Sequence, residues 1–170
     1  MFNKLKSILK NNKAFSNIEM AIGAIIIITI ISIAMDFSKM AIQHNAISSN
    51  MNYIARIVEQ QGGISNSKPS HYRGSYITSS TVYAGIKDSL AHVGIRESDW
   101  TLTINNATYT EDFNKSDYPY QTRITLRLTY QQRTPLISNF FPSMGTMTRT
   151  LERQIITTHY PRESGNIGYN

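Results

Sequence analysis

The chain of 170 residues contains no cysteine, 17 basic residues and 11 acidic residues. Without cysteine, a disulfide framework, a thiolate metal site and a cysteine nucleophile are all excluded. A net charge of +6 would favour a polyanionic partner such as nucleic acid. Four of the basic residues lie before Phe15, however, and the rest of the chain has thirteen basic and eleven acidic residues. Charge therefore predicts no nucleic-acid binding. The length allows one membrane segment and one small globular domain.

The first 35 residues combine a basic leader with an apolar run. Four lysines and no acidic residue precede Ala14: Lys4, Lys6, Lys10 and Lys13. Residues 15–35 are long enough to cross a hydrocarbon core of about 30 Å as a helix. Just after this span, the opposite charges of Asp36 and Lys39 cancel. This asymmetry predicts a single-pass protein of the cytoplasmic membrane, with a cytoplasmic amino end and the remainder outside.

Glu19 is the one ionisable residue in the apolar run. An ionisable group inside a bilayer span is costly, so Glu19 calls for a specific partner or role. A cleaved secretory signal is disfavoured, because small residues should follow its apolar core and Asp36-Phe37-Ser38-Lys39 follows here. An uncleaved signal anchor explains the lysines and the apolar run but leaves Glu19 unexplained.

Beyond Asp36 the helical pattern continues as an amphipathic extension. Its apolar residues recur at spacings of seven, four, three and four: Met40, Ile47, Met51, Ile54 and Val58. Polar residues, among them Gln43 and Asn50, are expected on the other faces. Gly62-Gly63 predicts that the helix ends at Gln61. The whole helix would be roughly 70 Å long.

The remaining sequence predicts one more helix and three strands. Ser80 is the expected cap of the helix, its apolar residues are spaced three and four apart, and Gly94 ends it. Alternating residues predict strands at 100–104, 120–131 and 149–160, with loops at 64–80 and 105–119. Arg123 and Arg127 share the outward face of the second strand and favour either solubility or ion pairing between subunits.

These elements predict an α+β fold in which a long N-terminal membrane-spanning helix packs against a small antiparallel sheet with one extra helix. The expected division is a basic leader at 1–14, a transmembrane helix with its amphipathic extension at 15–61, and an extracytoplasmic domain at 62–170.

An apolar loop joins the last two strands, although loops are normally polar. Its large apolar residues include Leu136, Ile137, Phe140 and Phe141. The loop either folds over an open end of the core or contacts a partner subunit or the membrane surface.

No combination of residues in the sequence indicates a catalysed reaction. The four histidines are scattered without metal-ligand spacing: His44, His71, His92 and His159. No serine lies in a nucleophile elbow, and no glycine-rich phosphate loop follows a strand. We expect a non-enzymatic protein with no catalytic residue, metal or cofactor.

The basic leader, the small residue at 14, Phe15, and Glu19 at the fifth position after the junction resemble the class III signal of type IV pilins and pseudopilins. The long helix ending M-N-Y-I-A-R-I-V-E-Q-Q-G-G and the late strands around a Thr-Pro-Leu loop look like the TadE-like minor pilins of tight-adherence (Tad/Flp) systems. The chain is also similar to pilin-like proteins of Gram-positive conjugative elements.

The resemblance implies that a prepilin peptidase cuts between Ala14 and Phe15, where the family usually has Gly before the cut. It implies that Glu19 pairs with the new amino terminus of a neighbouring subunit, and that a platform protein and an assembly ATPase drive assembly into a pilus on the cell surface. Two alternatives stay open: an uncleaved, signal-anchored component of a conjugation or secretion channel, and an adhesin domain on a membrane stalk.

Overall fold

The computed structural model describes residues 12–70, 72, 74–134, 136 and 145–158, with side chains from Ser16 onward. The chain divides into two compact units, one of residues 1–39 with 134–145 and one of residues 40–133 with 146–170. One helix, α2 (Asn12–Gln61), contributes residues to both units.

Helix α2 is 50 residues long, which corresponds to about 75 Å at the rise of an α-helix. It begins at Asn12, so the backbone is already helical at Ala14 and Phe15. It ends at Gln61 as predicted, because Gly62 follows with a φ of 71°, in the left-handed region that closes helices.

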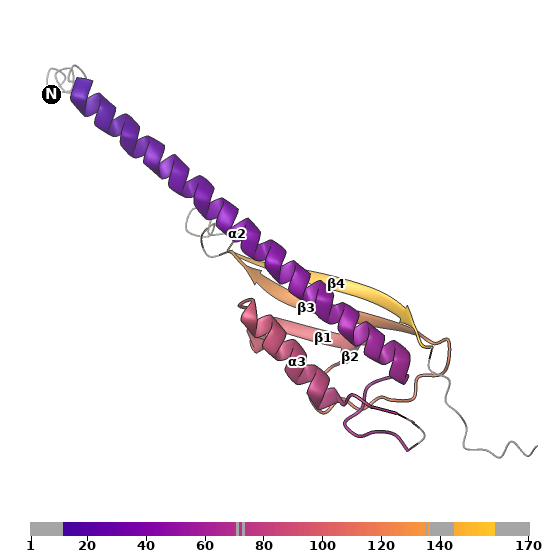
Figure 1. Ribbon diagram of the computed structural model, residues 1–170. Coiled ribbons are helices and arrows are strands. Elements are labelled where there is room, and N and C mark those ends of the chain that lie inside the picture. The colour runs from indigo at the N-terminus through magenta and orange to yellow at the C-terminus, as the bar shows by residue number, and fades with distance from the viewer. Residues whose placement is uncertain (1–11, 71, 73, 135, 137–144, 159–170) are drawn as a thin grey trace, which may run out of the picture. The chain divides into compact units, whose positions relative to one another are not determined.

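Four strands form one antiparallel sheet in the order β2-β1-β3-β4 (Figure 1). The strands are β1 (Trp100–Ile104), β2 (Ala107–Thr108), β3 (Arg123–Arg133) and β4 (Thr146–Ile156). Leu128 of β3 lies opposite Leu102 of β1 and Leu151 of β4, which fixes the register of the three long strands. Together with the helices, this sheet confirms the predicted α+β class.

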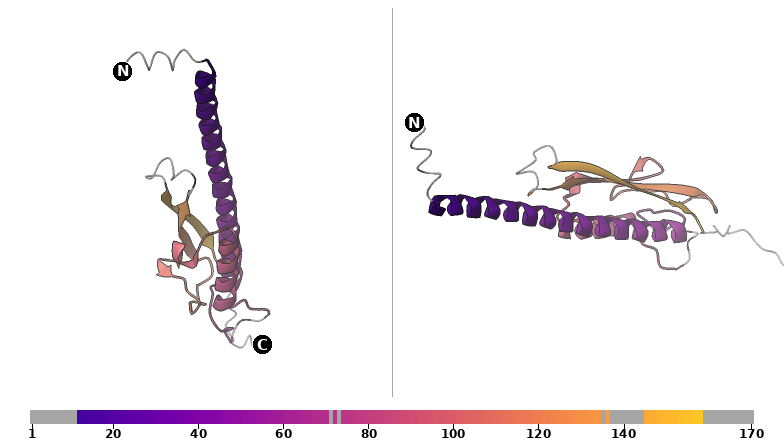
Figure 2. Two further views of the ribbon diagram at one scale, coloured as in Figure 1. Left: turned by 90° about the vertical axis from the view of Figure 1, so that its left-hand side faces the viewer. Right: turned by 90° about the horizontal axis from the view of Figure 1, so that it is seen from above.

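The helices of the second unit cover one face of the sheet. Helix α3 (Ser79–His92) and residues 40–61 of α2 lie on the same side (Figure 2). Fully buried side chains from the helices and the strands form one core: Ile47, Met51, Ile54, Val58, Val82, Ile86, Leu90, Leu102, Ile104, Ile124, Leu126 and Leu128. The apolar stripe predicted for the end of α2 is therefore core, apart from the half-buried Met40.

Polar contacts also join α2 to α3. Gln43 and Asn50 are only 2% and 8% exposed. The Gln43 amide donates to the Val93 carbonyl at 3.1 Å, and the Asn50 amide donates to the Ser89 hydroxyl at 2.9 Å. The sequence did not predict the burial of these two residues, because periodicity alone does not distinguish a solvated polar side chain from one bonded to a neighbouring helix.

Helix α3 starts earlier than predicted. Thr78, rather than Ser80, is the cap: it has an extended backbone, and its hydroxyl oxygen accepts the Thr81 N–H at 3.4 Å. Both Thr78 and Ser80 are good capping types, so composition did not separate them. The predicted end is confirmed, since Gly94 takes a φ of 77° directly after the helix.

Both ends of the last two strands and one loop differ from the prediction. The strand predicted at 120 begins at Arg123, because Gln121 has a φ of 61° and interrupts the extended backbone. That strand ends at Arg133 rather than at 131. The strand predicted at 149–160 begins at Thr146 and ends at Ile156, and the predicted residues 159 and 160 lie outside the described residues.

The loop predicted at 105–119 contains the short strand β2 (Ala107–Thr108). Asn105 and Asn106 both have positive φ, 48° and 66°, and connect β1 to β2. Asparagine tolerates this conformation better than most residues, so the Asn-Asn pair was the overlooked hairpin signal.

Aromatic side chains pack beside Trp100 at the edge of the core. The ring of Tyr83 lies 5.6 Å from that of Trp100 and 6.1 Å from that of Tyr109, which in turn lies 5.2 Å from Phe113. The Tyr109 hydroxyl donates to the Ser79 carbonyl at 3.0 Å. Burial raises the pKa of Tyr109 to about 12.

Candidate functional site

The N-terminal part of α2 is an apolar segment in which most large side chains are exposed. Each of the following is more than half exposed: Ile18, Met20, Ile22, Ile25, Ile26, Ile27, Ile28, Ile30, Ile31 and Met35. Among the described residues, α2 is the one helix long and apolar enough to cross a membrane, with a mean hydropathy of 2.5 in its most apolar window and none of that window buried. By length and composition alone, it can span a bilayer.

Polar groups of this segment form hydrogen bonds within the helix itself. The Thr29 hydroxyl donates to the Ile25 carbonyl at 2.8 Å, four residues earlier in the helix. A helix that satisfies its own polar groups in this way presents a nearly uniform apolar surface to its surroundings.

Glu19 lies near the amino end of this segment with its side chain exposed. On a helix, residues three and four positions apart are neighbours, so the neighbours of Glu19 include Ser16, Ile22 and Gly23. An added Cβ at Gly23 would meet no atom within 4 Å. The exposed Glu19 side chain is therefore open to approach by another molecule.

The other predicted site residues are described less fully. Ala14 and Phe15 have helical backbone in the first turn of α2, and their side chains lie outside the described part. In the apolar loop, Leu136 is half-buried, whereas Ile137, Phe140 and Phe141 lie outside the described residues. The roles proposed for these residues stay predictions, and the structure does not bring Glu19 and the loop residues into one described site.

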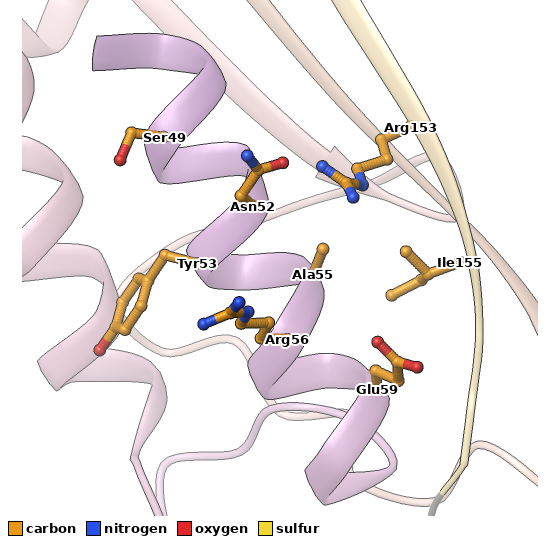
Figure 3. Close-up of a pocket in the computed structure, with 8 residues that line it drawn as sticks. All are labelled: Ser49, Asn52, Tyr53, Ala55, Arg56, Glu59, Arg153 and Ile155. Carbon is orange, nitrogen blue, oxygen red and sulfur yellow. The ribbon is translucent and has the colours of Figure 1, made fainter. Parts of the chain in front are cut away.

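Sequence reasoning missed a groove in the second unit, between α2 and β4 (Figure 3). The groove has a volume of about 510 Å³. Its sides carry Asn52, Arg56 and Glu59 of α2, and Arg153, which reaches from β4 toward α2. Ile155 of β4 points into it. The signal that could have found it is the pair of arginines on the strand that reads M-T-R-T-L-E-R-Q-I.

The groove arises because α2 covers β3 but not β4. Leu126 and Tyr130 of β3 are buried, whereas the residues opposite them on β4, Arg153 and Arg149, are exposed. Directly opposite residues share one face of a sheet, so both arginines stand on the helix-covered side.

The outward face of the sheet is polar. Arg123 and Arg127 are exposed on it, as predicted. Arg127 pairs with Glu152 of β4 at 2.8 Å within the same chain. This exposed cross-strand pair adds only modestly to stability.

No protein-family model, no curated protein and no solved structure matches this chain.

Proposed function

We propose that this chain is a non-enzymatic minor pilin or pseudopilin that assembles through α2 into, or at the tip of, a pilus-like filament. Residues 1–14 act as the leader, 15–61 as the membrane-spanning and assembly helix, and 62–170 as the extracytoplasmic domain. The observation that supports this best is Glu19, the one ionisable residue in the apolar run at 15–35, where ten large apolar side chains are more than half exposed.

A water-soluble monomer does not expose ten large apolar side chains along one helix, so this segment needs lipid or a bundle of like helices around it. A filament core made from these segments supplies the second environment. The same surface then serves the protein first in the membrane and afterwards in the filament.

The charge of Glu19 supports assembly over simple anchoring. Burial of a lone carboxylate in a low-dielectric bundle is costly, and an opposite charge makes it tolerable. Cleavage between Ala14 and Phe15 creates an amino group at Phe15, four residues before Glu19, and a neighbouring subunit can present its own such group to Glu19. An uncleaved chain has no amino group there.

The proposal implies several partners. They are the membrane, other pilin subunits, a prepilin peptidase for the leader, and a platform protein with an assembly ATPase for extraction from the bilayer. The lysines of the leader place its amino end in the cytoplasm and the domain outside. No cofactor is needed for this role.

Replacement of Glu19 by Ala tests the proposal. We expect the E19A protein to reach the membrane in normal amounts and to enter sheared filaments about tenfold less, because the buried amino group of its neighbour loses its partner. Thr29→Ala is the matched control, since that hydroxyl bonds only its own helix. Normal incorporation of E19A would contradict the charge-pairing role.

A further inference from the structure

Strand β4 ends the sheet with a long free edge. It is the last strand in the order, it pairs with β3 over all eleven residues, and among the described residues no strand lies on its other side. Only Ile155 is buried, and Leu151 is half-buried. Long regular edges of this kind are templates for pairing with another chain.

The hydrogen-bond pattern identifies which residues face that free edge. The Thr157 N–H donates to the Thr122 carbonyl at one end of the β3–β4 pairing, and the Thr134 N–H donates to the Gly145 carbonyl at the other, both at 3.1 Å. Both bonds join residues that lie directly opposite each other, so the hydrogen-bonded positions of this strand are the odd-numbered ones. Such pairs alternate along an antiparallel ladder, and the β3–β4 register is continuous. The odd-numbered residues of β4 therefore bond to β3, and the even-numbered ones, including Thr148 and Thr150, direct their N–H and C=O groups outward.

The helix-covered side of this edge is positively charged. Arg149 and Arg153 stand on that side of β4, and Arg56 lines the groove from α2. Within the described part of the chain none of these three arginines forms an ion pair, and Glu59 is the one carboxylate on that side of the groove. A segment laid along β4 would bring its inward side chains over this basic surface.

Pairing of β4 with β4 of a second copy is disfavoured. An antiparallel pairing that overlaps the whole strand places Arg149 opposite Arg153 of the other copy, twice. Like charges directly opposite one another destabilise a strand pair. The charges of β4 thus select against self-pairing and for carboxylates on an added strand.

We propose that the free edge of β4 binds an extended segment of another protein, which adds as a fifth strand and places carboxylates, four residues apart, opposite Arg149 and Arg153. Main-chain hydrogen bonds to the even-numbered residues supply the affinity, and the groove between β4 and α2 receives the inward side chains. This inference does not depend on the filament proposal, because it uses only residues of the second unit.

A displayed library of random eleven-residue peptides tests the proposal on the full-length protein in lipid nanodiscs. We expect peptides with Asp or Glu at positions i and i+4 to be enriched. In hydrogen exchange, an enriched peptide should slow the amides of Thr148, Thr150 and Glu152 more than those of their odd-numbered neighbours. Enrichment without acidic residues, or uniform exchange along β4, overturns the proposal.

Two variants test separately how the strand edge and the arginine charges contribute to peptide binding. Thr148→Pro removes one outward N–H without removing a bond to β3, a position at which edge strands accept proline, and should abolish binding. Arg149→Glu with Arg153→Glu should weaken binding of the enriched peptide about tenfold or more.

The control is Arg96→Glu, an exposed charge reversal between α3 and β1, which should leave affinity unchanged. If the T148P protein binds the peptide as tightly as the unaltered protein does, strand addition is contradicted. If T148P does not fold, the hydrogen-exchange measurement on the unaltered chain tests strand addition instead. Self-association that T148P abolishes would show that a second copy is the occupant and would overturn the assignment to another protein.

Discussion

Gly63 occupies a position that no other residue fits. Its φ is 141°, and a Cβ there would overlap the carbonyl oxygen of Lys115. This close approach follows from the bridge between Ile64 and Lys115, whose two backbone hydrogen bonds measure 2.9 and 2.8 Å. The bridge ties the loop after α2 to the loop before β3, so Gly63 sets how the long helix joins the domain.

We expect Gly63→Ala to destabilise the domain by about 1–3 kcal/mol, because the strained backbone and the overlap with Lys115 must both be relieved. Trp100 is the only tryptophan and is buried, so its fluorescence during urea unfolding reports on the domain.

The matched control is Gly85→Ala, at an exposed position of α3 where a Cβ meets nothing within 4 Å. It should stabilise the domain by about 0.5–1 kcal/mol. Equal effects of the two substitutions would show that the Gly63 turn is not a constraint.

Tyr109 makes the domain sensitive to alkali. Burial raises its folded-state pKa from 10.0 to about 12. Between these values the unfolded chain loses the phenolic proton and the folded one keeps it, so stability is complete below pH 10 and falls as the pH rises through 12. The slope for this one group is about 1.4 kcal/mol per pH unit.

Tyr109→Phe should therefore make the unfolding midpoint fall less steeply between pH 10 and 12, although the loss of the bond to Ser79 lowers stability at neutral pH. The measurement is Trp100 fluorescence in urea at several pH values. An unchanged slope would mean that other buried tyrosines, such as Tyr118, whose pKa burial also raises, dominate the effect.

At the scale of elements, α2 changes its surroundings along its length. Ile54 is fully buried in the domain core, whereas Ile27 is 58% exposed in the apolar segment. The same residue type in one helix thus has two roles, one in core packing and one, in our proposal, in contact with lipid or neighbouring subunits.

Ile54→Ala should cost the domain about 2–5 kcal/mol, because it leaves a cavity in a packed core. Ile27→Ala should change domain stability by less than about 0.5 kcal/mol. Trp100 fluorescence measures both, and a large loss from Ile27→Ala would show that the apolar segment also stabilises the domain.

Strong periodicity made most of the fold predictable. The four-residue spacing of Val82, Ile86 and Leu90 located α3, and the alternation from Ile124 to Tyr130 located β3. The ends of both helices were predictable from glycine, but the strand boundaries and the burial of polar residues were not, because they depend on single backbone angles, as at Gln121, or on partners from distant segments.

The candidate site was likewise only partly predictable from the sequence. Glu19 was recognisable because its charge interrupts an apolar run, which is a local signal. The groove beside β4 was not, since it exists only where the strand extends beyond the cover of α2. Arg56 and Arg153 meet there although they are far apart in the sequence.

At the scale of the whole molecule, the charge of the leader should determine membrane orientation. The chain has no cysteine, so a single cysteine introduced at Ser7 or at Gln131, an exposed position of β3, reports which side of the membrane it occupies. We expect a membrane-impermeant maleimide to label Gln131→Cys in intact cells and to label Ser7→Cys only after lysis.

Replacement of the four leader lysines by glutamate should reduce labelling of Gln131→Cys in intact cells, because the charge asymmetry is then lost. Unchanged labelling would show that the leader does not set the orientation. Total protein after lysis controls for differences in expression.

The central claim is that the chain is processed between Ala14 and Phe15 and then assembled through the exposed amino group and Glu19. The most direct measurement is the amino terminus of the protein from native membranes, by intact mass and terminal sequencing, with and without the prepilin peptidase. The account predicts a start at Phe15 that depends on the peptidase. A start at Met1 in both cases would contradict it and would identify α2 as a permanent anchor in which Glu19 has another partner.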